Sequence, residues 1–305
     1  MDVFSALSEE LRRACPALEL RTEEPMARHT TFRVGGPARL MALPGDKKEI
    51  KAAVRAAAAL GIAPFFLGNG SNLLVADGGY DGFIIKTGGL DQTREVNGHL
   101  RAECGIPLSR LAMAALGRGL TGLEFAHGIP GSLGGAVVMN AGAYGGEMVQ
   151  VLTAVTYLDE TGAEHTVPAA ECGLAYRRSM FTDHPAWLVL EAEMALEPGD
   201  AVEIRARMED LAQRRRSKQP LEYPSAGSTF KRPAGHFAAA LIEQCGLKGL
   251  TVGGAQVSEK HAGFVINRGG ATCADVLKLT EQIQETVLRE TGVALELEVR
   301  TLGCG

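Results

Sequence analysis

Glycine or alanine occupies nearly every other position between Gly128 and Gly146, in the run GIPGSLGGAVVMNAGAYGG. Each glycine there gives up side-chain burial and adds a conformational-entropy cost on folding, so packing alone does not account for the run. Bare backbone N–H groups can instead approach a phosphate or pyrophosphate closely. A second loop of this kind, Gly68-Asn69-Gly70-Ser71-Asn72, lies upstream. Two such loops predict a large, dinucleotide-like cofactor.

Each loop also has an alternative interpretation that involves no ligand. The first loop lacks the GxGxxG fingerprint of Rossmann folds, because Leu73 stands where the third glycine belongs and no helical pattern follows. An ordinary Rossmann site is therefore not expected, and a tight surface turn is the alternative to a phosphate loop. For the second loop, the alternative is close helix–helix packing through small residues.

Composition narrows the class of protein. The 305 residues are 46% hydrophobic and 22% charged, as in ordinary globular proteins, and the length allows two or three domains. A net charge of −5 argues against a nucleic-acid or anionic-membrane surface. The N-terminal residues lack signal-peptide order, and no apolar stretch reaches the length of a membrane span. We expect a cytoplasmic protein without nucleic-acid or membrane partners. The oligomeric state stays open, and a monomer is compatible with the sequence.

The six cysteines are scattered, with no CxxC motif and no histidine at ligand spacing. We therefore expect reduced thiols and no metal site.

Local patterns predict helices and short strands without a regular βα alternation, which favours an α+β fold. Asn97-Gly98 is a strong signal for a two-residue hairpin turn, and helix caps are predicted at Asp46 and Thr272.

Three parts of the chain are predicted, with boundaries at shifts in pattern and composition. The predicted domains are 1–89, 90–203 and 204–305. In the first, residues 73–85 are expected to form β-hairpins. In the last, residues 293–302 are expected to form a strand, because apolar and charged residues alternate there.

Several motifs, in order along the chain, resemble one known family. Beside the two glycine loops they are TFRVGG at 31–36, YRRS at 176–179, PSAGSTFKRP at 224–233 and LELEVR at 295–300. From about residue 29 to 303 the chain resembles the UDP-N-acetylenolpyruvoylglucosamine reductases, the MurB family. The resemblance implies an FAD-binding fold of the vanillyl-alcohol-oxidase (PCMH) type in two subdomains, followed by a C-terminal α+β substrate-binding domain. A compact stretch between the second and third of these motifs places the chain in the shorter, loop-lacking class.

The resemblance implies a two-step flavoenzyme of bacterial peptidoglycan synthesis. FAD takes a hydride from NADPH, which then leaves, and the enolpyruvyl ether of UDP-N-acetylglucosamine enters. Hydride goes to the terminal carbon of the enolpyruvyl group, and protonation of the adjacent carbon gives UDP-N-acetylmuramate. One site that serves two substrates in turn predicts ping-pong kinetics.

The family's catalytic arginine, serine and glutamate correspond to Arg177, Ser228 and Glu298. The resemblance implies that Arg177 and Glu298 stabilise charge on the substrate and that Ser228 donates the proton. From the residues alone, Ser228 is a turn serine, and no GxSxG elbow marks it as a hydrolase nucleophile. Arg177 and Arg178 are a surface pair that would point to opposite faces of a strand. Glu298 would lie with Arg300 on the solvent face of the last strand.

The same resemblance supplies the predicted ligand contacts. The FAD contacts are predicted at Arg33, Gly68, Asn69, Gly70, Ser71, Asn72, Gly128, Ile129, Pro130, Gly131, Ser132, Gly134, Gly135, Asn140, Ala141, Gly142 and Tyr144. The substrate contacts are predicted at Tyr176, Lys218, Lys231 and Arg232. A solvated helix end is the alternative for Lys218, which follows an arginine run at a predicted helix C-terminus.

Two other functions stay open at this point. One is a different flavoenzyme of the same fold that oxidises a small alcohol or lactone. The presence of Arg177, Ser228 and Glu298 in one chain argues against it. The other is a non-catalytic protein that binds a UDP-sugar or flavin.

Overall fold

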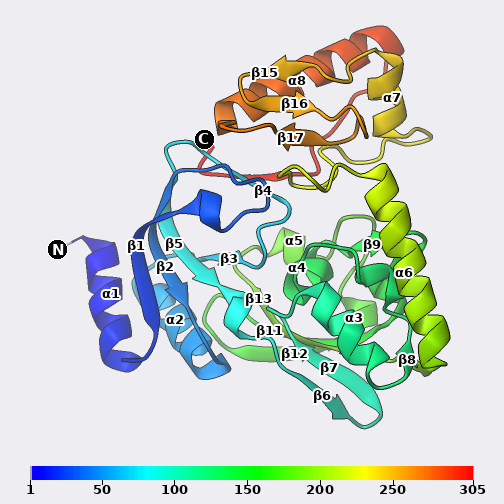
Figure 1. Cartoon of the computed structure of the whole chain (residues 1–305). Coiled ribbons are helices and arrows are strands. Elements are labelled where there is room, and N and C mark those ends of the chain that lie inside the picture. The colour runs from blue at the N-terminus through cyan, green and yellow to red at the C-terminus, as the bar shows by residue number, and fades with distance from the viewer. Residues whose placement is uncertain (1, 305) are drawn as a thin grey trace. The chain divides into compact units, whose positions relative to one another are not determined.

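The computed structural model describes residues 2–304 as a mixture of helices and short strands (Figure 1). The density of internal contacts divides the chain into two compact units, each with its own hydrophobic core. Unit 1 comprises Met1–Thr22, Arg39–Asn69 and Gly82–Gln213, and unit 2 comprises Glu23–Ala38, Gly70–Asp81 and Arg214–Gly305. The predicted division at residues 89 and 203 uses different boundaries and stays a prediction.

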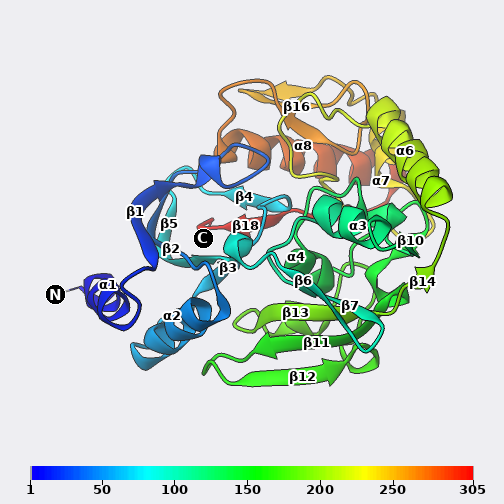
Figure 2. The same cartoon turned by 60° about the horizontal axis from the view of Figure 1, so that its bottom comes forward.

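Unit 1 contains a five-stranded antiparallel sheet in the order β12-β11-β13-β7-β6. Its strands are β6 (Thr93–Val96), β7 (His99–Glu103), β11 (Leu152–Leu158), β12 (Glu164–Pro168) and β13 (Leu188–Met194). The predicted hairpin is confirmed, since Val96 pairs with His99 and the turn residues Asn97 and Gly98 have φ of 52° and 79°. The short helix α4 (Leu133–Val138) lies across one face of the sheet, on the same side as α3 (Leu108–Leu116) (Figure 2).

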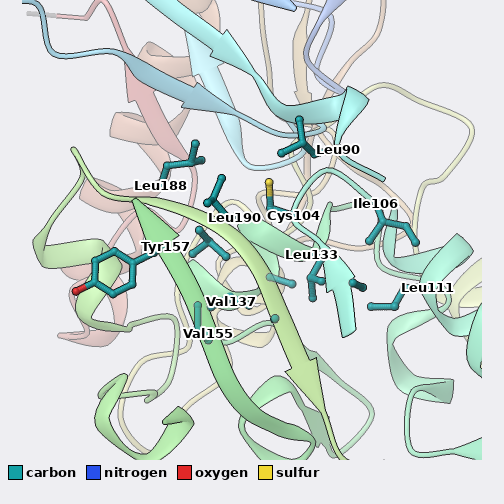
Figure 3. Close-up of a cluster of buried hydrophobic side chains, with 14 of the residues drawn as sticks. Leu90, Cys104, Ile106, Leu111, Leu133, Val137, Val155, Tyr157, Leu188 and Leu190 are labelled. Atoms are coloured by element: carbon teal, nitrogen blue, oxygen red, sulfur yellow. The ribbon is translucent and has the colours of Figure 1, made fainter. Parts of the chain in front are cut away.

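Part of the core of unit 1 fills the space between α4 and this sheet. Leu133 and Val137 of α4 face Leu190 of β13 and Cys104, which directly follows β7 (Figure 3). All four side chains are buried, and such burial contributes roughly 25 cal/mol per Å² of apolar surface. The glycine-rich stretch contains α4, so the apolar residues between its glycines fix it on the sheet.

A second sheet has the order β1-β2-β5-β3, and the boundaries of the two units fall within three of its strands. The strands are β1 (Glu19–Pro25), β2 (Pro37–Leu43), β3 (Phe65–Leu67) and β5 (Tyr80–Lys86). Helices α1 (Val3–Ala14) and α2 (Lys47–Ala59) pack against each other in unit 1. Asp46 caps α2 as predicted, because its carboxylate accepts hydrogen bonds from the N–H groups of Lys48 and Glu49 at 2.8 and 2.9 Å.

Shorter elements complete unit 1. They are the pairs β8 (Leu120–Thr121) with β14 (Glu197–Pro198) and β9 (Gly142–Ala143) with β10 (Gly146–Glu147), and the one-turn helix α5 (Met180–Asp183). The long helix α6 (Ala201–Lys218) begins in unit 1 and ends in unit 2. Within residues 2–304, no helix is both long and apolar enough to cross a membrane.

Unit 2 is built around α8 (Cys273–Thr291), which packs on a three-stranded antiparallel sheet (Figure 2). The sheet consists of β15 (Thr251–Val252), β16 (Ala255–Val257) and β17 (Val265–Asn267), and α7 (Ala238–Gln244) packs on α8. The predicted cap of α8 is confirmed. The Thr272 hydroxyl accepts from the N–H of Asp275 at 3.0 Å, and the Asp275 carboxylate accepts from the N–H of Thr272 at 3.0 Å.

One predicted strand region is wrong, and another is confirmed only in part. Residues 73–85 form no hairpin, because β4 (Leu73–Val75) pairs in parallel with β18 (Arg300–Leu302) while β5 belongs to another sheet. Of the predicted final strand, only β18 is regular. In both regions the hydrogen-bonding partner is remote in the sequence, so the local pattern of turns and alternation does not reveal it.

Candidate functional site

The glycine-rich stretch of unit 1 serves packing in part of its length. A Cβ atom on Gly134 would lie 3.0 Å from the Cβ of Cys104, and one on Gly146 would lie 2.5 Å from the Cγ of Phe125. The N–H of Gly134 already donates to the backbone carbonyl of Cys104 at 2.7 Å. The row of bare N–H groups is therefore shorter than the sequence predicts, and close packing explains these two glycines.

Another part of the stretch meets the first glycine loop within unit 1. The Nδ2 of Asn69 donates to the carbonyl oxygen of Pro130 at 3.1 Å, and a Cβ atom on Gly68 would lie 2.2 Å from the Oγ of Ser132. This Oγ is buried and has no hydrogen-bond partner within residues 2–304. A buried hydroxyl left unpaired costs about 1–3 kcal/mol, and a phosphate oxygen that accepted from it would remove the cost. These residues therefore fit the pyrophosphate of FAD.

Backbone strain gathers at residues predicted for the site. Six non-glycine residues among those described have a positive φ, and four of them are Arg33, Asn140, Tyr144 and Arg177. The left-handed region costs a non-glycine residue on the order of 1–3 kcal/mol, and such strain persists where the surrounding structure imposes it. The turn residue Asn97 is explained by its hairpin. Arg33, Asn140, Tyr144 and Arg177 lie in segments where the surrounding structure imposes a backbone geometry that costs local stability.

Arg177 lies in a tight turn, so the expected strand geometry does not apply to it. Ala175 and Arg178 exchange two backbone hydrogen bonds of 3.0 and 3.1 Å, which makes Tyr176 and Arg177 the central residues. Arg177 has φ of 54°, at the turn position that usually favours glycine. Its guanidinium carbon lies 5.0 Å from the ring centroid of Tyr176, whereas Arg178 pairs with Asp183 at 2.9 Å.

Two buried side chains hold this turn to the glycine-rich stretch. The Nδ2 of Asn140 donates to the carbonyl oxygen of Ala175 at 3.3 Å, and the Oγ of Ser179 donates to that of Val138 at 2.7 Å. Asn140 and Ser179 are each only 1% exposed. Asn140, which the sequence predicts as an FAD contact, thus links the stretch to the turn that carries Arg177.

In unit 2, the segments that carry Ser228 and Glu298 are hydrogen-bonded neighbours. The carbonyl oxygen of Thr229 accepts from the N–H of Glu298 at 2.9 Å, and Phe230 forms a β-bridge with Leu297. Thr229 is buried, and its hydroxyl accepts a backbone hydrogen bond from β17 at 2.9 Å. Two of the three predicted catalytic residues therefore lie on adjoining segments.

The part of the first glycine loop in unit 2 joins these segments. The carbonyl oxygen of Gly70 accepts from the N–H of Thr31 at 3.2 Å, and the Thr31 hydroxyl donates to the carbonyl oxygen of Ser225 at 2.7 Å. The Nδ2 of Asn72 donates to the carbonyl oxygen of Glu298 at 3.0 Å. Four of the motifs that carry the resemblance are thus connected within unit 2.

The predicted substrate contacts of unit 2 have neighbours of their own. Lys231 pairs with Glu296 at 3.0 Å, and the guanidinium carbon of Arg232 lies 4.0 Å from the ring centroid of Phe237. Lys218 is the exposed last residue of α6, as the helix-end alternative expects. Their contact with substrate stays a prediction.

Asn267 and Thr229 support this region, and the sequence did not single them out. Asn267 is buried, its Nδ2 donates to the carbonyl oxygen of Phe32 at 3.2 Å, and its Oδ1 accepts from the N–H of Gly269 at 2.9 Å. Asn267 stands two residues before the pair Gly269-Gly270, and this turn-forming composition is the available signal for it. The only sequence signal for Thr229 is its place next to Ser228.

Two titratable groups at the start of α8 in unit 2 have shifted pKa values. Backbone hydrogen bonds from Thr272 and Gly254 lower the pKa of Asp275 below its ordinary value. Burial raises the pKa of the Cys273 thiol to about 12, which favours the protonated thiol over the nucleophilic thiolate.

Known proteins match the chain over nearly its whole length. Residues 38–167 match the FAD binding domain, and residues 219–302 match the C-terminal domain of UDP-N-acetylenolpyruvoylglucosamine reductase. The protein of that name from Caldanaerobacter subterraneus subsp. tengcongensis is 47% identical over 297 residues, which cover 97% of this chain and 98% of that one. The chain belongs to the UDP-N-acetylenolpyruvoylglucosamine reductase family.

Further relatives agree with this assignment. The reductase from Clostridium novyi is 47% identical over 285 residues, or 93% of this chain and 92% of that one. The crystal structure of the Thermus caldophilus reductase matches with a TM-score of 0.79 at 36% identity, covering 93% of this chain and 98% of that one. The predicted family, the α+β fold with an FAD-binding domain and the FAD cofactor are confirmed.

Proposed function

We propose that this chain catalyses the FAD-dependent reduction of UDP-N-acetylglucosamine enolpyruvate to UDP-N-acetylmuramate, with NADPH as hydride donor, in the bacterial cytoplasm. The supporting observation is 47% identity over 97% of the chain to a reductase of this substrate. The hydrogen-bonded segments of Ser228 and Glu298 fit that chemistry. FAD, when bound, accepts hydride from NADPH and passes it to the substrate.

The chain's own residues stabilise charge and deliver the proton. After hydride reaches the terminal carbon, negative charge develops on the adjacent carbon and spreads onto the carboxylate. The planar guanidinium of Arg177 binds that carboxylate with a fixed pair of donors. Glu298 acts with it in stabilising the enolate-like species, and the Oγ of Ser228 donates a proton to the adjacent carbon. Groups placed in advance for such charge contribute a few kcal/mol each.

Two half-reactions, measured separately under anaerobic conditions, test this function. The purified protein is expected to be yellow, to lose its flavin absorbance on addition of NADPH, and to regain it rapidly when the enolpyruvyl UDP-sugar follows. Reduction by NADPH without reoxidation by this sugar would contradict the substrate. A protein that neither contains FAD nor takes it up would contradict the whole proposal. Flavin reduction by a small alcohol or lactone would indicate the other flavoenzyme class.

The role of Ser228 is tested with the same two measurements. In Ser228→Ala, we expect flavin reduction by NADPH to stay fast, because no substrate proton is transferred in that step. Reoxidation by the enolpyruvyl sugar is expected to slow by roughly 10²–10⁴-fold, the usual contribution of a placed proton donor. If both half-reactions keep their rates, Ser228 is not the acid.

A further inference from the structure

Asn72 forms hydrogen bonds to the backbone groups on both sides of Val299, the carbonyl group of Glu298 and the N–H of Arg300. Its Nδ2 donates to the carbonyl oxygen of Glu298 at 3.0 Å, and its own carbonyl oxygen accepts from the N–H of Arg300 at 3.1 Å. On the other side of Glu298, the carbonyl oxygen of Thr229 accepts from the Glu298 N–H at 2.9 Å. Both backbone polar groups of Glu298 therefore have fixed partners.

These bonds lie directly before the first paired residues of β4 and β18. The parallel pairing of β18 with β4 begins at Arg300 opposite Leu73, one residue after Asn72. Glu298 lies two residues before the regular strand, outside the paired residues of the ladder, and its carbonyl oxygen accepts from a side-chain donor. The Asn72 amide supplies that donor from a side chain. It thereby extends the pairing to the residue that carries the predicted catalytic carboxylate.

We propose that Asn72 is a positioning residue for Glu298. The sequence predicts Asn72 as an FAD contact, but its amide nitrogen is directed to the Glu298 backbone. The inference rests on the proposed function, because it matters for catalysis only if Glu298 acts on the substrate. The consequence is selective: Asn72 affects the half-reaction that needs Glu298 more than the half-reaction that needs only FAD and NADPH.

Asn72→Ala removes the donor and leaves every backbone group in place. We expect reoxidation by the enolpyruvyl sugar to slow by about 10–10²-fold, because small misplacements of a catalytic group have effects of this size. The loss is expected in the limiting rate at saturating sugar rather than in the sugar concentration that gives half that rate. Reduction by NADPH, retention of FAD during gel filtration, and the melting temperature are expected to change little.

A double-mutant cycle with Glu298→Gln separates positioning from general support of the fold. If Asn72 acts through the Glu298 carboxylate, Asn72→Ala adds little further loss in the Glu298→Gln background. Equal losses in both backgrounds would overturn the proposal. So would an unchanged reoxidation rate in Asn72→Ala, or an equal slowing of reduction and reoxidation.

Asn69→Ala is the matched control, since it removes the other amide of the same loop. The Asn69 side chain donates to Pro130, in unit 1. We expect that variant to lose FAD more readily without a selective effect on reoxidation. Should Asn72→Ala fail to fold, Asn72→Asp keeps the size of the side chain and replaces the Nδ2 donor with an acceptor, so the same selective loss is required of it. If the proposed function is wrong, the unsubstituted protein itself is not reoxidised by the sugar. If only this inference is wrong, the unsubstituted protein is reoxidised and Asn72→Ala shows no selective loss.

Discussion

Arg177 in unit 1 and Glu298 in unit 2 are held by different means. Glu298 follows a β-bridge and precedes a short parallel ladder, and its N–H donates to the backbone of Thr229. Arg177 lies at the left-handed position of a turn whose links to the glycine-rich stretch are the side chains of Asn140 and Ser179. Backbone hydrogen bonds mainly hold the Glu298 segment, whereas side-chain hydrogen bonds hold the Arg177 turn.

The two segments respond differently to single substitutions. A backbone hydrogen bond survives most side-chain substitutions, so most substitutions are expected to leave the position of the Glu298 segment unchanged. Asn72 is the exception, because its side chain is the donor. A turn that is strained and held by buried polar side chains loses its geometry when one of them is removed. Unit 1 is thus the more sensitive half, and the following predictions test that contrast.

Among the changes that test this contrast, Arg177→Gly gives the largest expected effect, because it removes the charge and the strain together. We expect reoxidation by the enolpyruvyl sugar to fall by about 10²-fold or more, as for loss of other groups that stabilise developing charge. Because glycine adopts the left-handed region readily, the free energy of unfolding is expected to rise, by up to about 1 kcal/mol. Stopped-flow reoxidation and urea unfolding measure the two effects.

Arg177→Lys is the matched control for this change. It keeps a positive charge and a Cβ atom at the left-handed position, so the strain remains and no gain in stability is expected. Activity still falls, because an ammonium group lacks the planar pair of donors. A rise in stability in Arg177→Lys, or none in Arg177→Gly, would show that the positive φ stores no strain.

Asn140→Ala is expected to have the next largest effect. Its Nδ2 donates to the carbonyl oxygen of Ala175 and to the carboxylate of Glu147, and its Oδ1 accepts from the N–H of Val149. Leaving such buried groups unpaired costs about 1–3 kcal/mol, measured as a lower urea midpoint. Reoxidation is expected to slow as well, since the Arg177 turn loses an anchor.

Ser179→Ala removes a single hydrogen bond from the same turn and is therefore a graded control. Its loss of stability is expected near 1 kcal/mol, smaller than that of Asn140→Ala. The reverse order would mean that Ser179, through Val138, is the main link between the turn and the glycine-rich stretch.

The sequence predicts those parts of the fold whose signals are local. Asp46 and Thr272 cap helices as expected, and Asn97-Gly98 forms its hairpin, because each signal lies within a few residues of the bonds that it forms. The catalytic residues come from family motifs alone. No periodicity distinguishes Ser228 from an ordinary turn serine.

The remaining features depend on partners that are remote in the sequence or on strain. Asn72 and Glu298 are 226 residues apart, so neither motif predicts their hydrogen bond. The pairing of β4 with β18 is equally remote, so the local pattern wrongly predicts β-hairpins for residues 73–85. Arg177 occupies a turn position where local preference favours glycine, so propensity alone argues against the observed turn.

The smallest predicted effect concerns the pH dependence of stability, where the two units differ again. Burial of Glu191 in unit 1 opposes its ionisation, but hydrogen bonds from Lys47 and Arg94 outweigh burial and lower its pKa below the ordinary 4.5. A lowered native pKa means that the ionised carboxylate stabilises the fold above pH 4.5, and that this contribution is lost as pH falls through the native pKa. We therefore expect the melting temperature to fall in that acidic range.

Glu191→Gln is expected to lower the melting temperature at neutral pH, because Lys47 and Arg94 lose their carboxylate, and to flatten the acidic decline. In unit 2, the pKa of Asp275 is also lowered, by backbone hydrogen bonds at the start of α8. Asp275 is closer to solvent, so solvent screens its charge more and Asp275→Asn is expected to flatten the decline less. Thermal melts of both variants across the acidic range measure this order. An equal flattening would mean that the buried ion pairs of unit 1 are no more important for acid stability than one helix cap in unit 2.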